Sequence, residues 1–272
     1  MLRHGVRRRC HRVFCLCLDA RCWTVIVVEQ GYREWIDERR SHILERMERA
    51  AAVSGRTLDD VSLLAVSKTV GVGEVLAAID AGYRGFAENR PQELNRKLEA
   101  LSMVSDLPPV RFDMIGNLQT NKINAVLGRV ELIHSIESLH LARAVSSRAE
   151  RKMDAGELPG PQPVLIEVNV SGEATKSGFA PDELRACFEE LRGLCGIVPR
   201  GLMTMAPRGD KSVARACFAG LRELRDELEC SFDVELPELS CGMSEDFEQA
   251  IEEGSTIVRL GRVVFDPTFE VK

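Results

Sequence analysis

The sequence predicts an α/β fold, a (β/α)8 TIM barrel preceded by one extra N-terminal helix. Three observations support this prediction. From residue 32 onward, helical stretches alternate with short apolar runs rich in β-branched residues, and eight such runs can be counted. Runs such as residues 164–170 are apolar almost throughout, which is typical of parallel strands that helices cover. The length of 272 residues suits one barrel domain.

The first predicted element is a helix over residues 32–54, which carries Ile36, Ile43 and Met47 on one face and ends before Gly55. The first strand, residues 61–66, follows it. Seven more strands are predicted over residues 83–87, 111–115, 130–135, 163–170, 197–204, 236–240 and 256–260. Helices are predicted between the strands, over residues 73–81, 90–102, 119–128, 137–153, 180–193, 211–229 and 245–253.

An open, doubly wound sheet has the same alternation and is the alternative fold. It is disfavoured because no Gly-x-Gly-x-x-Gly sequence opens a helix after the first strand. The eight strands and their helices therefore predict a single domain over residues 26–272.

Residues 1–25 do not continue this pattern. Residues 1–22 contain six arginines against the single acidic residue Asp19, together with four cysteines. The apolar run over residues 13–18 is too short for the core of a signal peptide, and the cysteine and histidine spacing matches no standard zinc site. We therefore expect a disordered extension or an over-long start, with targeting and metal binding as lesser alternatives.

The composition argues against several classes of function. The net charge of −6 argues against nucleic acid as the main partner, because phosphate binding needs clustered cations. No apolar stretch approaches the roughly 18 residues that a membrane span requires. The nine cysteines are odd in number and lack framework spacing, which favours free thiols in the cytoplasm. No long heptad pattern is present, so we expect a monomer.

Polar residues follow the ends of the predicted strands, where barrels of this type carry their functional groups. Lys68 follows the first strand. We expect burial and neighbouring cations at this rim to favour the neutral amine that Schiff-base formation requires. The alternative is a lysine that reaches solvent or pairs with a carboxylate.

The loops after the seventh and eighth strands predict an anion site. Gly242 and Gly261 allow backbone N–H groups to approach a ligand, Ser244 supplies a hydroxyl, and Arg262 supplies a positive charge. Barrels often bind phosphate in these two loops. Ser244 has a second interpretation as the N-cap of the helix over residues 245–253. An amine and a phosphate site at one rim indicate a cofactor that carries an aldehyde and a phosphate.

Eight segments of the sequence occur in an order that is typical of one family. They are residues 63–69 (LLAVSKT), 86–93 (FAENRPQE), 115–122 (IGNLQTNK), 134–136 (HSI), 168–178 (VNVSGEATKSG), 201–207 (GLMTMAP), 239–244 (LSCGMS) and 258–261 (VRLG). On these segments the chain resembles the pyridoxal phosphate homeostasis proteins over residues 32–266.

The resemblance implies a barrel related to the N-terminal domain of alanine racemase, with pyridoxal 5′-phosphate (PLP) held as an internal aldimine on Lys68. It also implies that Ser244, Gly261 and Arg262 grip the phosphate. An arginine that faces the pyridine nitrogen in this family corresponds to Arg259.

Two further residues, Asn89 and Met243, fall in segments that lie near the cofactor in the family. Two departures are visible, because Ala87 stands where the family usually has glycine and Asp113 stands where it commonly has histidine. Asp113 is expected to alter the charge of the rim or to pair with a nearby cation. Neither departure touches Lys68 or the phosphate loops, so PLP binding is still expected.

These features predict a PLP-binding protein that acts in intracellular PLP homeostasis by binding and buffering the cofactor and delivering it to apo PLP-dependent enzymes. No catalytic residue and no metal ligand is predicted. The sequence ends a few residues after the last strand, where a racemase would continue into a tyrosine-bearing domain, and its own Tyr32 and Tyr83 are poorly placed. The guanidinium of Arg259 can only donate, so the ring nitrogen is expected to stay unprotonated and to withdraw electrons weakly.

The alternative function is a PLP-dependent, racemase-like enzyme of low activity, in which Lys68 and His134 exchange protons slowly. His134 is equally well interpreted as a structural hydrogen-bonding residue. A lysine-dependent aldolase without a cofactor is disfavoured, because it needs no phosphate site and the sixth strand carries no lysine.

Overall fold

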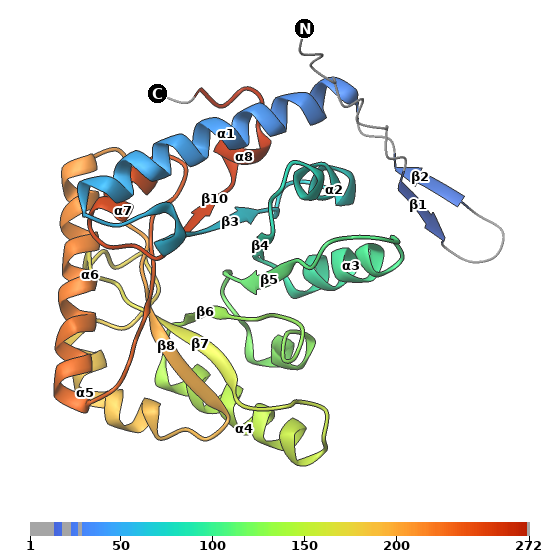
Figure 1. The fold of residues 1–272 in the computed structure, drawn as a ribbon. Coiled ribbons are helices and arrows are strands. Elements are labelled where there is room, and N and C mark those ends of the chain that lie inside the picture. The colour runs from blue at the N-terminus through green and yellow to red at the C-terminus, as the bar shows by residue number, and fades with distance from the viewer. Residues whose placement is uncertain (1–13, 18–22, 27–28, 271–272) are drawn as a thin grey trace, which may run out of the picture.

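The central feature is a closed barrel of eight parallel strands (Figure 1), as the sequence predicts. The computed structural model describes residues 14–17, 23–26 and 29–270. Around the barrel the strands follow the order β10-β3-β4-β5-β6-β7-β8-β9, and β9 pairs with β10 to close it. Their bounds are β3 Ser62–Val66, β4 Gly85–Glu88, β5 Arg111–Met114, β6 Ile133–Ile136, β7 Gln162–Glu167, β8 Ile197–Met203, β9 Glu238–Ser240 and β10 Ile257–Leu260.

Helices connect successive strands on the outside of the barrel (Figure 1). Their apolar faces pack on the sheet, and this burial supplies most of the core. The α-helices are α1 Gln30–Val53, α2 Val72–Asp80, α3 Pro91–Ser102, α4 Leu139–Asp154, α5 Pro181–Arg192, α6 Lys211–Phe232, α7 Phe247–Glu252 and α8 Arg262–Phe265.

Several elements differ from the sequence prediction. The helix predicted over residues 119–128 is the 3-10 helix η2, Thr120–Ala125, in a segment whose threonine and asparagines have low α-helix propensity. The short helix α8 is not predicted at all, because four residues are too few to show a periodic pattern. A second 3-10 helix, η1 Leu58–Asp60, joins α1 to β3.

The extra helix α1 lies beside α7 and α8, at the junction of the first and last barrel strands (Figure 1). The hydroxyl of Tyr32 donates to the backbone oxygen of Phe265 at 3.3 Å. Nη1 of Arg39 donates to the backbone oxygen of Phe269 at 3.1 Å. The predicted N-terminal helix is therefore confirmed, and it holds the segment that follows the last strand.

The interior of the barrel is partly apolar and partly polar. A small apolar cluster fills it, made of Leu64, Val66, Ala87, Leu132, Leu165, Met203 and Ile257. Polar residues on these strands are also buried, among them Asp113, His134, Ser240 and Arg259. Buried polar groups need hydrogen-bond partners, so this interior must contain a connected network.

Phe14–Cys17 (β1) and Trp23–Ile26 (β2), which together reach one residue beyond the expected extension, form an antiparallel pair. The other residues of that extension lie outside the described part of the chain, so its disorder stays a prediction. No helix among the described residues has the length and apolarity that crossing a bilayer requires.

Candidate functional site

A cavity of about 160 Å³ lies at the carboxyl ends of the barrel strands. It is lined by all seven residues that the sequence places at the cofactor: Lys68, Asn89, Met243, Ser244, Arg259, Gly261 and Arg262. These residues come from β10 and from the segments that follow β3, β4, β9 and β10. The barrel therefore brings together groups that are far apart in the sequence, as expected at the functional end of this fold.

Lys68 lies two residues beyond the end of β3, and its side chain is exposed. The expectation that Lys68 is buried is therefore wrong. The strand ends at Val66, so the residues after it stand at the open mouth of the barrel rather than within the sheet. The nearby cations that the sequence leads us to expect are present, since Arg208, Arg259 and Arg262 line the same cavity.

A buried ion pair supports the backbone directly before Lys68. Lys97 of α3 and Glu88 at the end of β4 form a salt bridge, and each side chain is only 1% exposed. Nζ of Lys97 also donates to the backbone oxygen of Ser67 at 2.5 Å, and Oγ of Ser67 donates to Oε1 of Glu88 at 2.6 Å. This Ser67–Glu88–Lys97 network ties the ends of β3 and β4 to a helix and fixes the chain from which Lys68 extends.

Ser244 connects the two loops that are predicted to hold phosphate. Its side-chain oxygen accepts a hydrogen bond from the backbone N–H of Val263 at 3.2 Å, which links the loop after β9 to α8. The predicted N-cap role of Ser244 is wrong, because α7 begins at Phe247 and Asp246 precedes it. The hydroxyl hydrogen of Ser244 has no acceptor among the described residues, so it is free to donate to a ligand.

The two glycines of these loops serve different purposes. Gly242 has a φ of +93°, and a Cβ there would lie 2.6 Å from Cβ of Ala250, so the fold itself requires glycine. A Cβ on Gly261 would meet only ordinary contacts, the nearest being Cβ of Val66 at 3.5 Å. None of the described residues around position 261 requires glycine there, which suits a position kept open for a ligand.

Arg262 is expected to supply a positive charge to the anion site, but its side chain is already paired. Its Nη2 donates to Oε1 of Glu245 at 2.7 Å, and its guanidinium lies 4.9 Å from the ring centroid of Phe269. Glu245 therefore neutralises much of the charge that a phosphate would use. The side chain of Arg262 is half exposed, so this pair can rearrange around an anion at little energetic cost.

Arg259 is held by a hydrogen-bond chain that crosses the barrel interior. Its Nη1 donates to Oγ of Ser240 at 2.7 Å, and Oγ of Ser240 lies 2.9 Å from Nδ1 of His134. Nε2 of His134 lies 3.2 Å from Oδ2 of Asp113, which also accepts from Nη2 of Arg111 at 3.3 Å. A carboxylate can only accept, so Nε2 of His134 carries the hydrogen and Nδ1 accepts from the Ser240 hydroxyl.

This chain explains the departure at Asp113. The carboxylate is fully buried inside the barrel, where it pairs with Arg111 as one of the two expected outcomes describes. Burial lowers the pKa of His134 below its usual value, so the imidazole is neutral near pH 7. Both ring nitrogens of His134 are engaged, by Ser240 and Asp113, which gives it the structural role of orienting Ser240 and, through it, Arg259.

Asn89 and Met243 complete the wall of the cavity. The side-chain Oδ1 of Asn89 is buried and has no hydrogen-bond partner among the described residues, so it is an acceptor left for a ligand. The backbone N–H of the half-buried Met243 donates a hydrogen bond to Oδ1 of Asp246 at 2.6 Å. Burial raises the pKa of Asp246 above its usual value.

Neither tyrosine of the sequence reaches the cavity. Tyr83 lines a different pocket together with Val61 and Arg111, at the amino ends of the strands and thus on the rim opposite Lys68. Tyr32 lies on α1, and burial raises its pKa to about 12. Neither phenol is placed to exchange a proton at Lys68.

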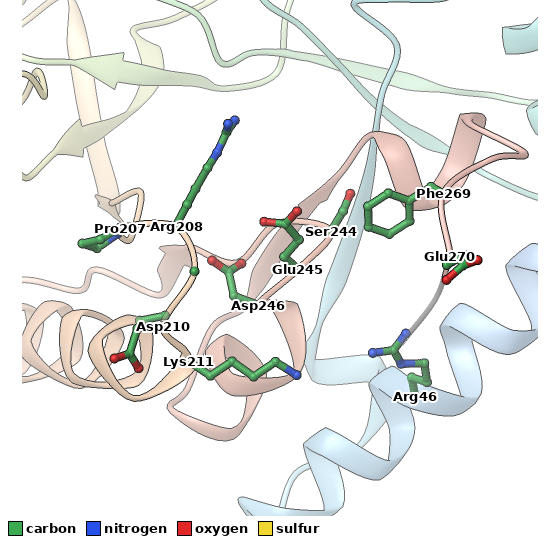
Figure 2. Close-up of a pocket in the computed structure, with 12 residues that line it drawn as sticks. Arg46, Pro207, Arg208, Asp210, Lys211, Ser244, Glu245, Asp246, Phe269 and Glu270 are labelled. Atoms are coloured by element: carbon green, nitrogen blue, oxygen red, sulfur yellow. The ribbon is translucent and has the colours of Figure 1, made fainter.

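A larger cleft of about 370 Å³ adjoins the cofactor cavity and shares Arg208 and residues 244–246 with it. Figure 2 shows Glu245 and Asp246 in the middle of this cleft, with Arg208 and Asp210 on one side and Phe269 and Glu270 on the other. The seven predicted residues do not gather in this larger cleft. The smaller cavity is therefore the candidate cofactor site, and no role in holding the cofactor is assigned to the larger cleft beside it.

Glu167, the last residue of β7, is a functional candidate that the sequence interpretation missed. Its side chain is 2% exposed, and burial raises its pKa to about 7, with Glu137 adding to the effect and Arg259 opposing it.

Among the residues with described side chains, no group of three or more histidine, cysteine, aspartate or glutamate side chains could hold a metal ion.

We expect Glu167→Gln to stabilise the fold more at pH 8 than at pH 5. An acid whose folded pKa is raised stabilises the fold at low pH, and this contribution is lost as the pH rises from its unfolded pKa to about 7. The gain in the free energy of unfolding should grow by about 2–3 kcal/mol between the two pH values. Urea titrations of both proteins at both pH values measure this change in unfolding free energy, with the exposed Glu157→Gln as control. If Glu167→Gln stabilises the fold equally at pH 5 and pH 8, the carboxylate of Glu167 is not buried as a charge at pH 8.

Comparisons with known proteins agree with this fold. A family model of the alanine racemase N-terminal domain matches residues 40–267. The pyridoxal phosphate homeostasis protein of Aquifex aeolicus is 43% identical over 229 residues, which cover 84% of this chain and 96% of that protein. The structure of PipY from Synechococcus elongatus with PLP bound has a TM-score of 0.68 and 33% identity, and the match covers 81% of this chain and 99% of that chain. An alanine racemase of Clostridium difficile, at 13% identity and a TM-score of 0.64 over 89% of this chain and 58% of that chain, shares the fold.

Proposed function

Because the chain belongs to the family of pyridoxal phosphate homeostasis proteins, we propose that it binds PLP and acts in PLP homeostasis. The single observation that carries the proposal is the shared cavity, in which an amine and a phosphate-binding loop face one opening. PipY, a relative of this chain, has been solved with PLP bound.

The residues of the cavity fit each part of the cofactor. Lys68 would hold the aldehyde carbon as a Schiff base, and Ser244, Gly261 and the backbone near Arg262 would hold the phosphate. Arg259, fixed by Ser240, would face the ring nitrogen. PLP supplies an electrophilic carbon and a ring that accepts electrons from it.

The charge opposite the ring favours storage over catalysis. Burial lowers the pKa of the Arg259 guanidinium below its usual value, yet the group remains a donor. A ring nitrogen facing a permanent donor stays unprotonated and withdraws electrons weakly. Neither tyrosine lines the cavity, so no phenol is placed there to act as the second base of a racemase. We propose that the protein holds PLP, limits free aldehyde and passes the cofactor to apo-enzymes.

This role can be separated from that of a weak enzyme by measuring turnover. The cofactor-loaded protein would be incubated with several L-amino acids, and racemisation and decarboxylation would be followed by chiral chromatography. We expect turnover well below about 1 s⁻¹, the lower end of ordinary enzyme rates. Turnover at or above that rate would favour the racemase-like alternative.

The setting of the protein is part of the same proposal. The described cysteines at 187, 195, 217, 230 and 241 are all free, which supports a reducing cytoplasm. We propose that the protein works there as a monomer.

The open position at Gly261 gives a test of the phosphate site. We expect Gly261→Ala to leave thermal stability nearly unchanged, because the added Cβ meets only ordinary contacts. The same methyl group would crowd a bound phosphate and weaken PLP binding by about tenfold or more. Binding titrations and thermal unfolding of the two proteins measure both effects. Equal PLP affinity would contradict a phosphate at this loop.

A further inference from the structure

Two carboxylates stand at the barrel mouth on the side opposite Lys68. Glu167 ends β7, and Glu137 directly follows β6. In the closed order β10-β3-β4-β5-β6-β7-β8-β9, β7 lies four strands from β3 in either direction. Glu167 and Lys68 therefore stand across the opening from each other.

The side chain of Glu167 faces the interior of the barrel. It is the register partner of Met203 on β8, and partners on adjacent parallel strands place their side chains on the same face. Met203 lines the cofactor cavity. Arg259 lines the same cavity, and its charge opposes the raised pKa of Glu167.

Both carboxylates have an unused oxygen. Oε2 of Glu167 and Oε2 of Glu137 are buried without a hydrogen-bond partner among the described residues. The two acids also repel each other, which contributes to the raised pKa of Glu167. Arg259 does not neutralise them by contact, since it donates to Ser240 and Thr204. A buried carboxylate without a donor is costly and is retained where a ligand supplies the donor.

The missing ligand is a cation that donates N–H groups. Two carboxylates without a third ligand suit an ammonium better than a divalent metal, and no metal-binding group of three occurs among the residues whose side chains are described. We propose that Glu167 and Glu137 bind the ammonium group of the primary amine that removes PLP from Lys68. This proposal rests on the proposed function and adds the chemical class of the acceptor.

The exchange balances with the groups present. The bound ammonium gives one proton to the carboxylate of Glu167 and becomes a free amine. Its nitrogen bonds to the carbon that Lys68 holds, the bond from that carbon to Nζ of Lys68 breaks, and the two remaining amine hydrogens pass to Nζ. Glu167 then returns its proton to solvent, so no oxidant or reductant is needed.

The test is the release of PLP from the cofactor-loaded protein by n-butylamine at about pH 8. We expect the release rate to saturate with amine concentration, because the amine binds before it reacts. Trimethylamine hydrochloride, which donates an N–H but cannot form a Schiff base, should compete, whereas sodium chloride of equal ionic strength should not. Glu167→Gln should raise the half-saturating concentration by about tenfold or more, and the exposed Glu157→Gln should not.

Direct binding gives a second readout that does not depend on the cofactor. Trimethylamine hydrochloride should bind the PLP-free protein in calorimetry and bind Glu167→Gln and Glu137→Gln more weakly. A lysine-containing peptide in place of n-butylamine shows whether the acceptor amine can belong to a protein. The proposal would be overturned if the release rate does not saturate with amine concentration and both variants bind trimethylamine hydrochloride as the wild type does. It would also be overturned if magnesium chloride competes with n-butylamine and trimethylamine hydrochloride does not. Borohydride trapping on Lys68 in the same samples tests the proposed function separately.

Discussion

Replacing Lys68 by alanine is expected to abolish covalent retention of PLP. Of the residues that line the cavity, Lys68 alone has a primary amine, so no neighbouring side chain in the described structure can take its place. The variant keeps the phosphate loops and Arg259, and it should still bind PLP non-covalently. We expect its affinity to fall by about 100-fold or more, since the bond to the aldehyde carbon is lost.

Visible absorption and gel filtration measure this effect directly. Wild-type protein should keep its PLP absorption through gel filtration, and Lys68→Ala should lose it. Lys152→Ala, on the outer helix α4, is the matched control and should behave like wild type. If Lys68→Ala retains reducible PLP as wild type does, the anchoring residue is a different one.

Replacing Lys97 by methionine is expected to destabilise the fold strongly. It leaves the carboxylate of Glu88, 1% exposed, without its partner, and removes the donor to the backbone oxygen of Ser67. Breaking a buried ion pair in this way costs about 3–5 kcal/mol of unfolding free energy. Oε2 of Glu88 already lacks a hydrogen bond among the described residues, so no other group is ready to compensate.

The double variant Glu88→Leu with Lys97→Met separates the charge from the packing. Removing both charges together should cost much less than Lys97→Met alone, because no unpaired charge is left behind. Urea titration of both variants measures the difference. Lys152→Met breaks the more exposed pair with Glu157 and should cost less than about 1 kcal/mol. A small effect of Lys97→Met would mean that water reaches Glu88.

The fold could be predicted because the alternation of helices and apolar strands repeats eight times, and each repeat is specified locally. The boundaries were less predictable. The predicted strand over residues 163–170 ends at Glu167, where hydrogen bonding to β8 gives way to the single bridge between Val168 and Phe179. Such an end depends on contacts with distant residues, which a local pattern does not contain.

The gathering of the seven cavity residues could be predicted for a similar reason. In a parallel barrel all strands end at the same rim, so residues after strand ends must meet. The pairing of Arg262 with Glu245 could not be predicted, because it depends on how two loops fold toward each other.

Lys97 and Glu167 were missed although the sequence contains a signal for both. Lys97 is three residues after Leu94 and four before Leu101, on the buried face of α3, where a lysine must find a buried partner. Glu167 is the single charged residue of β7 and directly follows three apolar residues. A single charged residue on an otherwise apolar face is therefore a candidate for a structural or functional role, in addition to the polar residues of the loops.

The central claim is that the amine of Lys68 holds PLP at the mouth of the barrel, and mass spectrometry of the borohydride-reduced protein tests it most directly. Reduction makes the link permanent, and tryptic peptides then show which lysine carries the pyridoxyl group. We predict the modification on the peptide containing Lys68 and on no other. A pyridoxyl group on a different lysine, or none on the wild-type protein, would contradict the account.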